Sequence, residues 1–188
     1  LVFMHLGLWA LSALVVCAVE YNGAFADTNL LESIYYSLFM SLTTRNAGFA
    51  TMSMNDMSGT IQVLFGILMF IGSSPNSAGG GIRTTTLLLT VLFFVSFSKG
   101  REQVVIRKKS IKLESVYKSL MVIIGAGVLI IIALMIMTHT EPFTLREIFF
   151  EIASAFGTTG LSLGITSSLS TIGKITLIIV MFCGRVGI

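Results

Sequence analysis

Residues 154–164 read SAFGTTGLSLG, a run of small and hydroxyl-bearing side chains set between two apolar segments. The apolar segment that leads into it, 145–156, is about a dozen residues long, which as a helix rises roughly 18 Å. That rise falls short of the roughly 30 Å hydrocarbon core of a bilayer. The pattern is typical of a helix that enters a membrane part of the way and returns as a loop.

The amino-acid composition indicates that the chain is embedded in a lipid bilayer. Of the 188 residues, 54% are hydrophobic and 11% are charged, and mean hydropathy is +0.92. A soluble domain is about a quarter charged, so we expect an all-α integral membrane protein. The two cysteines, Cys17 and Cys183, lie in separate apolar runs and indicate neither a disulfide framework nor a metal site.

Four apolar stretches are long enough to cross hydrocarbon, which takes about 20 helical residues. They are residues 1–19, 60–98, 113–138 and 171–188, and the second is interrupted. Two shorter stretches, 30–42 and 145–156, are expected to be half-helices. Because no basic region precedes the first stretch, we expect a span there and no cleaved signal peptide.

Charge predicts the orientation. Seven of the twelve basic residues fall between positions 99 and 118, and seven of the nine acidic residues fall in the connections on the opposite side. By the positive-inside rule the linker 99–112 is cytoplasmic. A basic run of this kind is usually a solvated anchor beside lipid; the alternative is a docking surface for a cytoplasmic partner.

An internal repeat supports this arrangement of spans and connections. LESIYYSLFMSLTT (31–44) aligns without gaps to LREIFFEIASAFGT (145–158). Each copy follows a span and an acidic outer loop, and precedes a polar loop and another span. The sequence therefore predicts a unit of span, half-helix, loop and span that occurs twice, in residues 1–112 and 113–188.

The two polar loops predict a cation pathway. The first loop is TTRNAGFAT (43–51) and the second loop is GTTGLSLGIT (157–166). Irregular backbone at membrane depth must be buried in protein or line a watery cavity, and backbone carbonyls around an axis can replace the hydration shell of a cation. Gly48 and Gly160 allow the positive φ that aims carbonyls inward. The C-terminal, partly negative ends of the half-helices favour a cation there.

A third irregular segment, GSSPNSAGGGIRTTT (72–86), interrupts the long second span. Proline and consecutive glycines disfavour helix, and the segment lacks the pattern of a nucleotide-binding loop. Mid-membrane irregular backbone should face a cavity, so residues 72–83 are expected to obstruct the inner pore. Arg185 falls in the last span, where arginine is costly, and is expected to face the pore or this segment. Arg45 is expected to tie the first loop's backbone in place.

Together the motifs TTRNAGFAT, GTTGLSLGIT, GSSPNSAGGGIRTTT and FCGRVG resemble the KtrB-type membrane subunit of bacterial Ktr potassium transporters, in the Trk/Ktr/HKT superfamily. The resemblance implies four pore repeats around one filter, of which this chain holds the third and fourth, with the final helix cut short. It also implies multi-pass insertion in the bacterial plasma membrane, a homodimer of full-length subunits, and a cytoplasmic KtrA-type ring. ATP or ADP would bind in that ring, and this chain would carry K⁺ but no organic cofactor.

The resemblance also assigns residues to roles. The filter would consist of residues from both loops, namely Asn46, Ala47, Gly48, Phe49, Thr158, Thr159, Gly160, Leu161 and Ser162. The gate would consist of the Gly-rich residues of the broken span and one arginine, namely Gly72, Ser73, Ser74, Pro75, Asn76, Ser77, Ala78, Gly79, Gly80, Gly81 and Arg185.

Three alternatives remain open from the sequence. A sodium-permeable relative would share the same pattern. An intramembrane enzyme would need catalytic polar residues facing each other within the spans, and the sequence shows neither a nucleophile–base pair nor a metal-ligand cluster. A non-conducting assembly protein would not need matched loops after matched half-helices.

Overall fold

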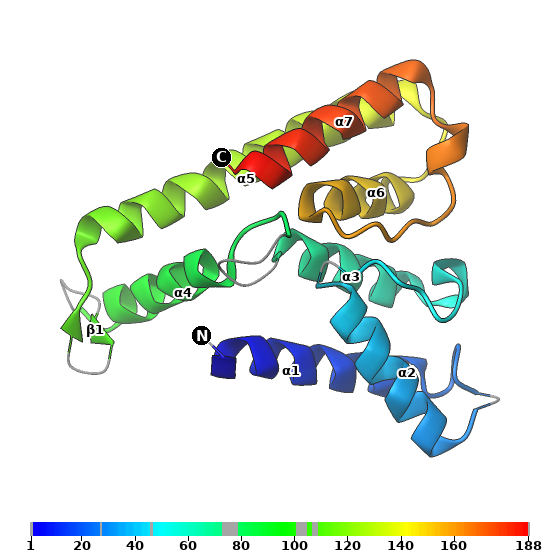
Figure 1. Ribbon diagram of the computed structural model, residues 1–188, viewed down its shortest axis with the longest axis horizontal. Helices are drawn as coiled ribbons and strands as arrows, with labels where there is room; N and C mark the ends of the chain where they lie inside the picture. Colours follow the sequence, from blue (N-terminus) through cyan, green and yellow to red (C-terminus); the bar gives the residue numbers. More distant parts are fainter. Residues whose placement is uncertain are drawn as a thin grey trace.

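The chain is arranged around a central pair of helices, α3 (Gly59–Phe70) and α6 (Leu145–Gly157), which pack against each other (Figure 1). The structure, a computed structural model, describes residues 2–26, 28–45, 47–72, 79–100, 105–106 and 109–187. On one side of the pair lie α1 (Val2–Glu20) and α2 (Leu30–Thr43), and on the other lie α5 (Leu113–Thr140) and α7 (Thr171–Val186). Short 3₁₀ turns, Met54–Asp56 and Thr166–Ser168, precede α3 and α7.

The interrupted span forms two separate helices. α3 ends at Phe70 and α4 (Thr84–Ser98) begins beyond the Gly-rich segment (72–83). Figure 1 shows α4 beside the first part of α5 and α3 beside α6. By length and composition, α5 is the one helix in the described part of the chain that is long and apolar enough to cross a membrane alone. Shorter apolar helices are Met4–Glu20, Gly59–Phe70 and Thr84–Ser98.

The linker between α4 and α5 holds a small antiparallel hairpin that the all-α expectation missed. Strand β1 (Val105–Ile106) pairs with β2 (Lys109–Ser110), with Val105 opposite Ser110. The β-branched residues of β1 favour extended backbone. Two-residue strands are too short to give a periodic signal, so hydropathy alone does not predict them.

Two apolar clusters hold the helices together. One joins α1, α2 and α3 to α6 through Val16, Met40, Phe65, Met69 and Phe150, all fully buried. The second joins α5, α6 and α7, with fully buried Met137 and Ile152 beside Val180. Helix α6 contributes to both clusters, so the chain positions this short helix and the loop that follows it from two sides.

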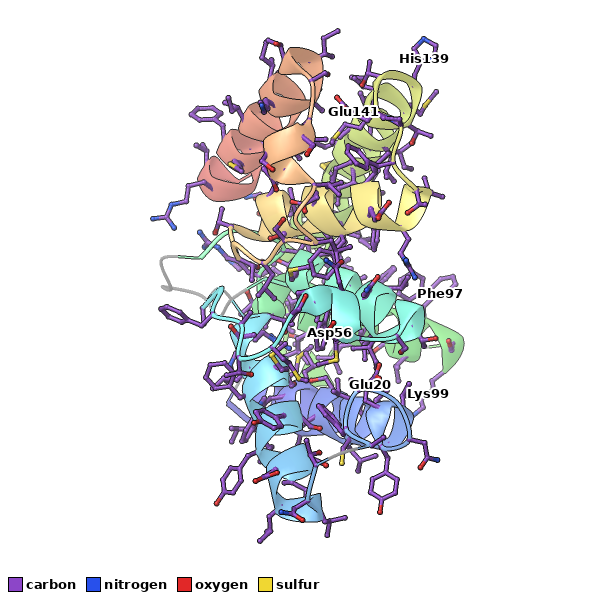
Figure 2. All side chains as sticks on the ribbon, turned by 90° about the vertical axis from the view of Figure 1, so that its right-hand side faces the viewer. Glu20, Asp56, Phe97, Lys99, His139 and Glu141 are labelled. Carbon is purple, nitrogen blue, oxygen red and sulfur yellow. The ribbon has the colours of Figure 1, made fainter. Side chains whose placement is uncertain are left out.

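Two buried glutamates join the C-terminal ends of α1 and α5 to the starts of α3 and α7. Glu20, at the end of α1, is 1% exposed and accepts a hydrogen bond from the Ser58 backbone N–H at 2.8 Å. Glu141, just after α5, accepts hydrogen bonds from the Ser170 backbone N–H at 3.1 Å and from the Ser170 hydroxyl. Ser58 and Ser170 are the N-cap residues of α3 and α7. Figure 2 shows Glu20 and Glu141 in opposite halves of the molecule.

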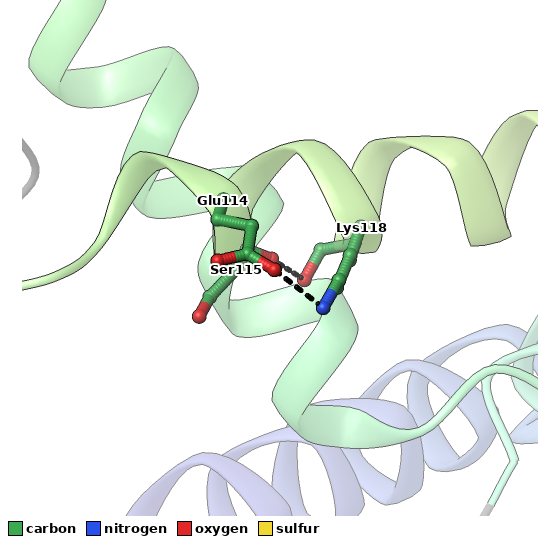
Figure 3. A network of polar contacts seen from close by, with 4 residues as sticks. Glu114, Ser115 and Lys118 are labelled. Carbon is green, nitrogen blue, oxygen red and sulfur yellow. Dashed lines mark hydrogen bonds and ion pairs between the residues drawn. The ribbon is translucent and has the colours of Figure 1, made fainter.

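We expect Glu141→Gln to lower the thermal stability of the protein in detergent. The substitution weakens the charge-assisted hydrogen bonds of a buried carboxylate to the start of α7, which costs roughly 1–3 kcal/mol. Glu114→Gln is the matched control, because Glu114 pairs with Lys118 at 2.7 Å on the surface, with both side chains 73% exposed (Figure 3). Such a pair contributes at most about 0.5 kcal/mol. Equal melting temperatures for the two variants would contradict the structural role of Glu141.

Matching capping boxes start the two short helices. At α2 the box joins Asn29 and Glu32, and at α6 it joins Thr144 and Glu147. Hydrogen bonds from the Thr144 hydroxyl and backbone N–H lower the pKa of Glu147. The first residues of α2 and α6, Leu30 and Leu145, are 115 positions apart, whereas the last residues, Thr43 and Gly157, are 114 positions apart. The gapless alignment therefore fits the helix ends, and α2 begins one residue earlier than it implies.

Candidate functional site

The two glycine bends lie against each other near the centre of the molecule. Gly48 has φ +71° and Gly160 has φ +95°, both in the region that favours glycine. A Cβ on Gly48 would collide with the Thr159 carbonyl oxygen and would lie 3.5 Å from the Gly160 Cα. The Thr159 hydroxyl also donates to the Thr44 carbonyl at 3.5 Å. Two segments more than a hundred residues apart thus form one backbone surface.

The end of α2 shapes the first loop. The Thr43 carbonyl accepts from the backbone N–H groups of Ala47 and Gly48 at 3.2 and 3.3 Å. The Thr43 hydroxyl donates to the Phe49 carbonyl at 2.6 Å. Thr43 therefore binds the backbone both before and after the Gly48 Cα and so fixes the bend. Of the four filter residues assigned to this loop, Asn46 lies outside the described residues.

The end of α6 shapes the second loop. Thr158 caps the helix with φ 51°, and among the described residues it is the one non-glycine with positive φ. Ser154 accepts from the Thr159 N–H through its carbonyl at 3.0 Å and from the Gly160 N–H through its hydroxyl at 3.2 Å. A β-branched residue in this conformation is strained, and such strain persists only where the surroundings fix the backbone.

The Gly-rich segment contacts both loops and α7. The Gly80 N–H donates to the Thr158 hydroxyl at 2.8 Å, and the Gly81 N–H donates to the Gly184 carbonyl at 3.2 Å. At the other end of the segment, Arg45 Nη1 donates to the Gly72 carbonyl at 3.5 Å. Six residues assigned to the gate lie outside the described residues: Ser73, Ser74, Pro75, Asn76, Ser77 and Ala78.

The positions of Arg45 and Arg185 differ in part from those expected from the sequence. Arg45 does bind a backbone carbonyl, but the carbonyl belongs to Gly72 at the start of the Gly-rich segment and not to its own loop. Arg185 is exposed, and among the described residues the Gly184 carbonyl, next to it in α7, accepts a hydrogen bond from the Gly81 N–H of the Gly-rich segment. The sequence did not predict this role for Gly184, where a Cβ would collide with the Phe156 carbonyl.

A cavity of about 940 Å³ brings these segments together. Residues of both loops, the Gly-rich segment, α6 and α7 line it: Arg45, Ala47, Gly79, Glu151, Ser154, Ala155, Thr158, Gly160, Leu161, Ser162, Thr166, Leu177, Met181, Phe182 and Arg185. Phe49, assigned to the filter, is 71% exposed and is not part of this lining.

The cavity lining is largely apolar, and hydroxyl groups and three charged side chains interrupt it. Within the described residues, no group of three or more His, Cys, Asp or Glu side chains is placed to hold a metal ion. Apolar side chains of the second loop, α6 and α7 line it together with glycine, threonine and serine residues and three charged side chains, Arg45, Glu151 and Arg185. The neutral oxygens that could hold a cation briefly are those of the backbone and hydroxyl groups at the two bends.

Glu151 is a second residue of this site, after Gly184, whose role the sequence did not predict. The sequence placed it among the outer acids, but the structure buries it to 4% exposure beneath the second loop. Its position within an apolar half-helix, four residues after the capping Glu147, is the signal that was available. A buried carboxylate is rare unless it is paired or hydrogen-bonded.

Comparisons with known proteins identify relatives of the chain. The family model of TrkH, described as a cation transport protein, matches residues 1–188. The Ktr system potassium uptake protein D of Bacillus subtilis is 45% identical over 176 residues, which are 94% of this chain and 39% of that protein. The potassium/sodium uptake protein NtpJ of Enterococcus hirae is 35% identical over 174 residues, 90% of this chain and 39% of that protein.

A solved structure has the same fold. The crystal structure of the potassium transporter TrkH from Vibrio parahaemolyticus superposes with a TM-score of 0.82 at 19% sequence identity, covering 97% of this chain and 41% of that one. The chain thus spans about two fifths of the length of the relatives it matches.

Proposed function

Because this chain belongs to the TrkH family of cation transport proteins, we propose that it forms part of a pathway for potassium uptake across a bacterial plasma membrane. The observation that carries the proposal is the contact between the two glycine bends, which brings both loops to one cavity. Potassium is the transported substrate, and its passage needs no covalent chemistry. The relatives named above are described as potassium or potassium/sodium uptake proteins.

The chain is organised as two pore repeats, residues 1–112 and 113–188, each with a span, a half-helix, a loop and a second span. The paired glutamates support this division, because Glu20 binds the N-cap of α3 as Glu141 binds the N-cap of α7. Figure 1 places the hairpin linker at one end of the molecule and the turns after α1 and α5 at the other. That arrangement agrees with a cytoplasmic basic linker and acidic outer turns.

The filter consists of the backbone around the two glycines. Its members are Asn46, Ala47, Gly48, Phe49, Thr158, Thr159, Gly160, Leu161 and Ser162. The C-terminal ends of α2 and α6 both lead into these loops, so the partly negative helix ends favour a cation between them. Holding the ion by carbonyl oxygens replaces its hydration shell.

The Gly-rich segment serves as the gate beneath this filter. Its described residues contact Thr158 of the second loop and Gly184 of α7, so a displacement of the segment has to break hydrogen bonds to both. Arg185 lines the cavity next to it. The positions from Ser73 to Ala78 are proposed as part of the gate on the sequence alone.

The partners follow from the relatives' names and from the resemblance. "Ktr system" names a system of proteins, and we propose a cytoplasmic nucleotide-binding ring of the KtrA type as the regulatory partner, with ATP or ADP bound in that ring. The full-length subunit is proposed to be a homodimer. The basic linker 99–112 and the Gly-rich segment are the points through which the ring acts.

Uptake of potassium and sodium by bacteria that lack their own potassium uptake systems tests the proposal. Cells that express the full-length protein should accumulate K⁺ and grow at low K⁺. Equal uptake of Na⁺ would favour the sodium-permeable alternative, for which the potassium/sodium name of the Enterococcus relative is the supporting observation. Uptake of neither ion, with the protein present in the membrane, would favour a non-conducting assembly role.

A further inference from the structure

Glu151 holds the second loop with three hydrogen bonds. Its Oε1 accepts from the Ser162 hydroxyl at 2.6 Å and from the Leu163 backbone N–H at 3.0 Å. Its Oε2 accepts from the Thr166 hydroxyl at 2.8 Å. The side chain is 4% exposed, and its bond to the Leu163 N–H is buried, whereas the two bonds to hydroxyls are partly buried. A carboxylate makes stronger hydrogen bonds than a neutral acceptor.

Two residues of α6, Ser154 and Glu151, bind five residues of the second loop. Ser154 and Glu151 are one helical turn apart, so their side chains lie on the same face of the helix. Ser154 binds the backbone of Thr159 and Gly160, whereas Glu151 binds the stretch from Ser162 to Thr166. The loop is held on its far side as well, because Asn55 Nδ2 donates to the Leu163 carbonyl at 3.2 Å.

The first loop has no counterpart of this carboxylate. In the gapless alignment, Ser37 of α2 corresponds to Glu151. The Ser37 hydroxyl donates to the Ser33 carbonyl within its own helix at 2.7 Å. The first loop is instead closed by Thr43. The second loop is therefore held by a glutamate where the aligned position of α2 is a serine.

We infer that Glu151 is a positioning residue that fixes the second loop at the geometry that distinguishes potassium from sodium. The inference rests on the proposed function. A small ion such as Na⁺ is favoured when coordinating oxygens are free to close in on it, so selectivity by backbone carbonyls requires some restraint on the loop that carries them. The donors that Glu151 binds are two hydroxyls and one backbone N–H, all of them neutral groups of the loop. Among the described residues the one ion pair is Glu114–Lys118.

The first test replaces Glu151 with glutamine in the full-length protein. Glutamine keeps the shape, but its amide nitrogen is a donor, so the loop's three donors cannot all be accepted. We expect the ratio of K⁺ to Na⁺ uptake to fall about tenfold, the order of effect of unmade hydrogen bonds to a buried charged group. Glu147→Gln is the matched control, because it makes the same change one turn away on the same helix, at an exposed cap.

The second test approaches the same contact from the loop. Thr166 is exposed, so Thr166→Val removes the hydroxyl that binds Oε2 with little risk to folding. We expect it to lower the same ratio, and we expect the Glu151→Gln/Thr166→Val double variant to lower it by less than the product of the two single effects. That coupling is a readout that general instability would not produce.

The outcomes separate this inference from the proposed function. An unchanged K⁺/Na⁺ ratio in both single variants, with normal potassium uptake, would overturn the positioning role and leave potassium transport standing. Lost uptake in Glu151→Gln together with an unchanged ratio in Thr166→Val would also overturn it. Absence of potassium uptake by the unaltered full-length protein would overturn the proposed function itself.

Discussion

Replacing Gly48 with alanine is expected to abolish selective potassium uptake by the full-length protein. Gly48 has φ +71°, and a Cβ there would collide with the Thr159 carbonyl oxygen of the second loop. Both the strain at positive φ and the collision act on the backbone that we propose binds the ion. Together they exceed roughly 3 kcal/mol, which corresponds to a reduction of about a hundredfold or more in uptake at low K⁺.

Gly127→Ala provides the matched control. Gly127 lies within α5, and a Cβ there would meet nothing within 4 Å. Alanine is a better helix former than glycine by about 1 kcal/mol, so this variant should transport as well as the unaltered protein. Wild-type uptake and selectivity in Gly48→Ala, with equal amounts of both variants in the membrane, would show that the bend is not part of the ion pathway.

Removing residues 74–80 is expected to raise ion flux. The deletion takes away Gly79, which lines the cavity, and Gly80, which donates to Thr158. If the segment blocks the pore for most of the time, its loss raises flux on the order of tenfold. Flux of ⁸⁶Rb⁺ into proteoliposomes that contain the full-length protein measures the effect.

A second substitution shows where the added flux passes. Combining the deletion with Gly48→Ala should remove the increase, because ions that pass the missing gate still have to cross the filter. Flux that stays high in the combined variant would point to a leak elsewhere. Flux that does not rise in the deletion alone would count against a gating role for the Gly-rich segment.

Local signals in the sequence were sufficient to predict the helices and the loop that follows each half-helix. The length of an apolar run separates a half-helix of about a dozen residues from a span of about twenty, and small polar residues between the runs mark the loops. Gly48 and Gly160 were expected to allow positive φ at the bends, and both have it. The family, too, was identified from its loop motifs, and the comparisons confirm it.

Contacts between distant residues were beyond the reach of the sequence. The glutamates Glu20, Glu141 and Glu151 all fell in regions predicted to face outward, yet each binds a backbone N–H of another segment. Nothing in composition separates a solvated acid from one that accepts three hydrogen bonds in the interior. The contact of Arg45 with Gly72 was hidden for the same reason, because its partner is a backbone carbonyl 27 positions away.

Anomalous X-ray scattering from Rb⁺ or Tl⁺ in crystals of the full-length protein tests the central claim most directly. If backbone oxygens of the two loops hold the transported ion, the scattering peak will lie between the bends at Gly48 and Gly160. A protein that takes up these ions but shows the peak elsewhere, with the space between the two bends empty, would contradict the account.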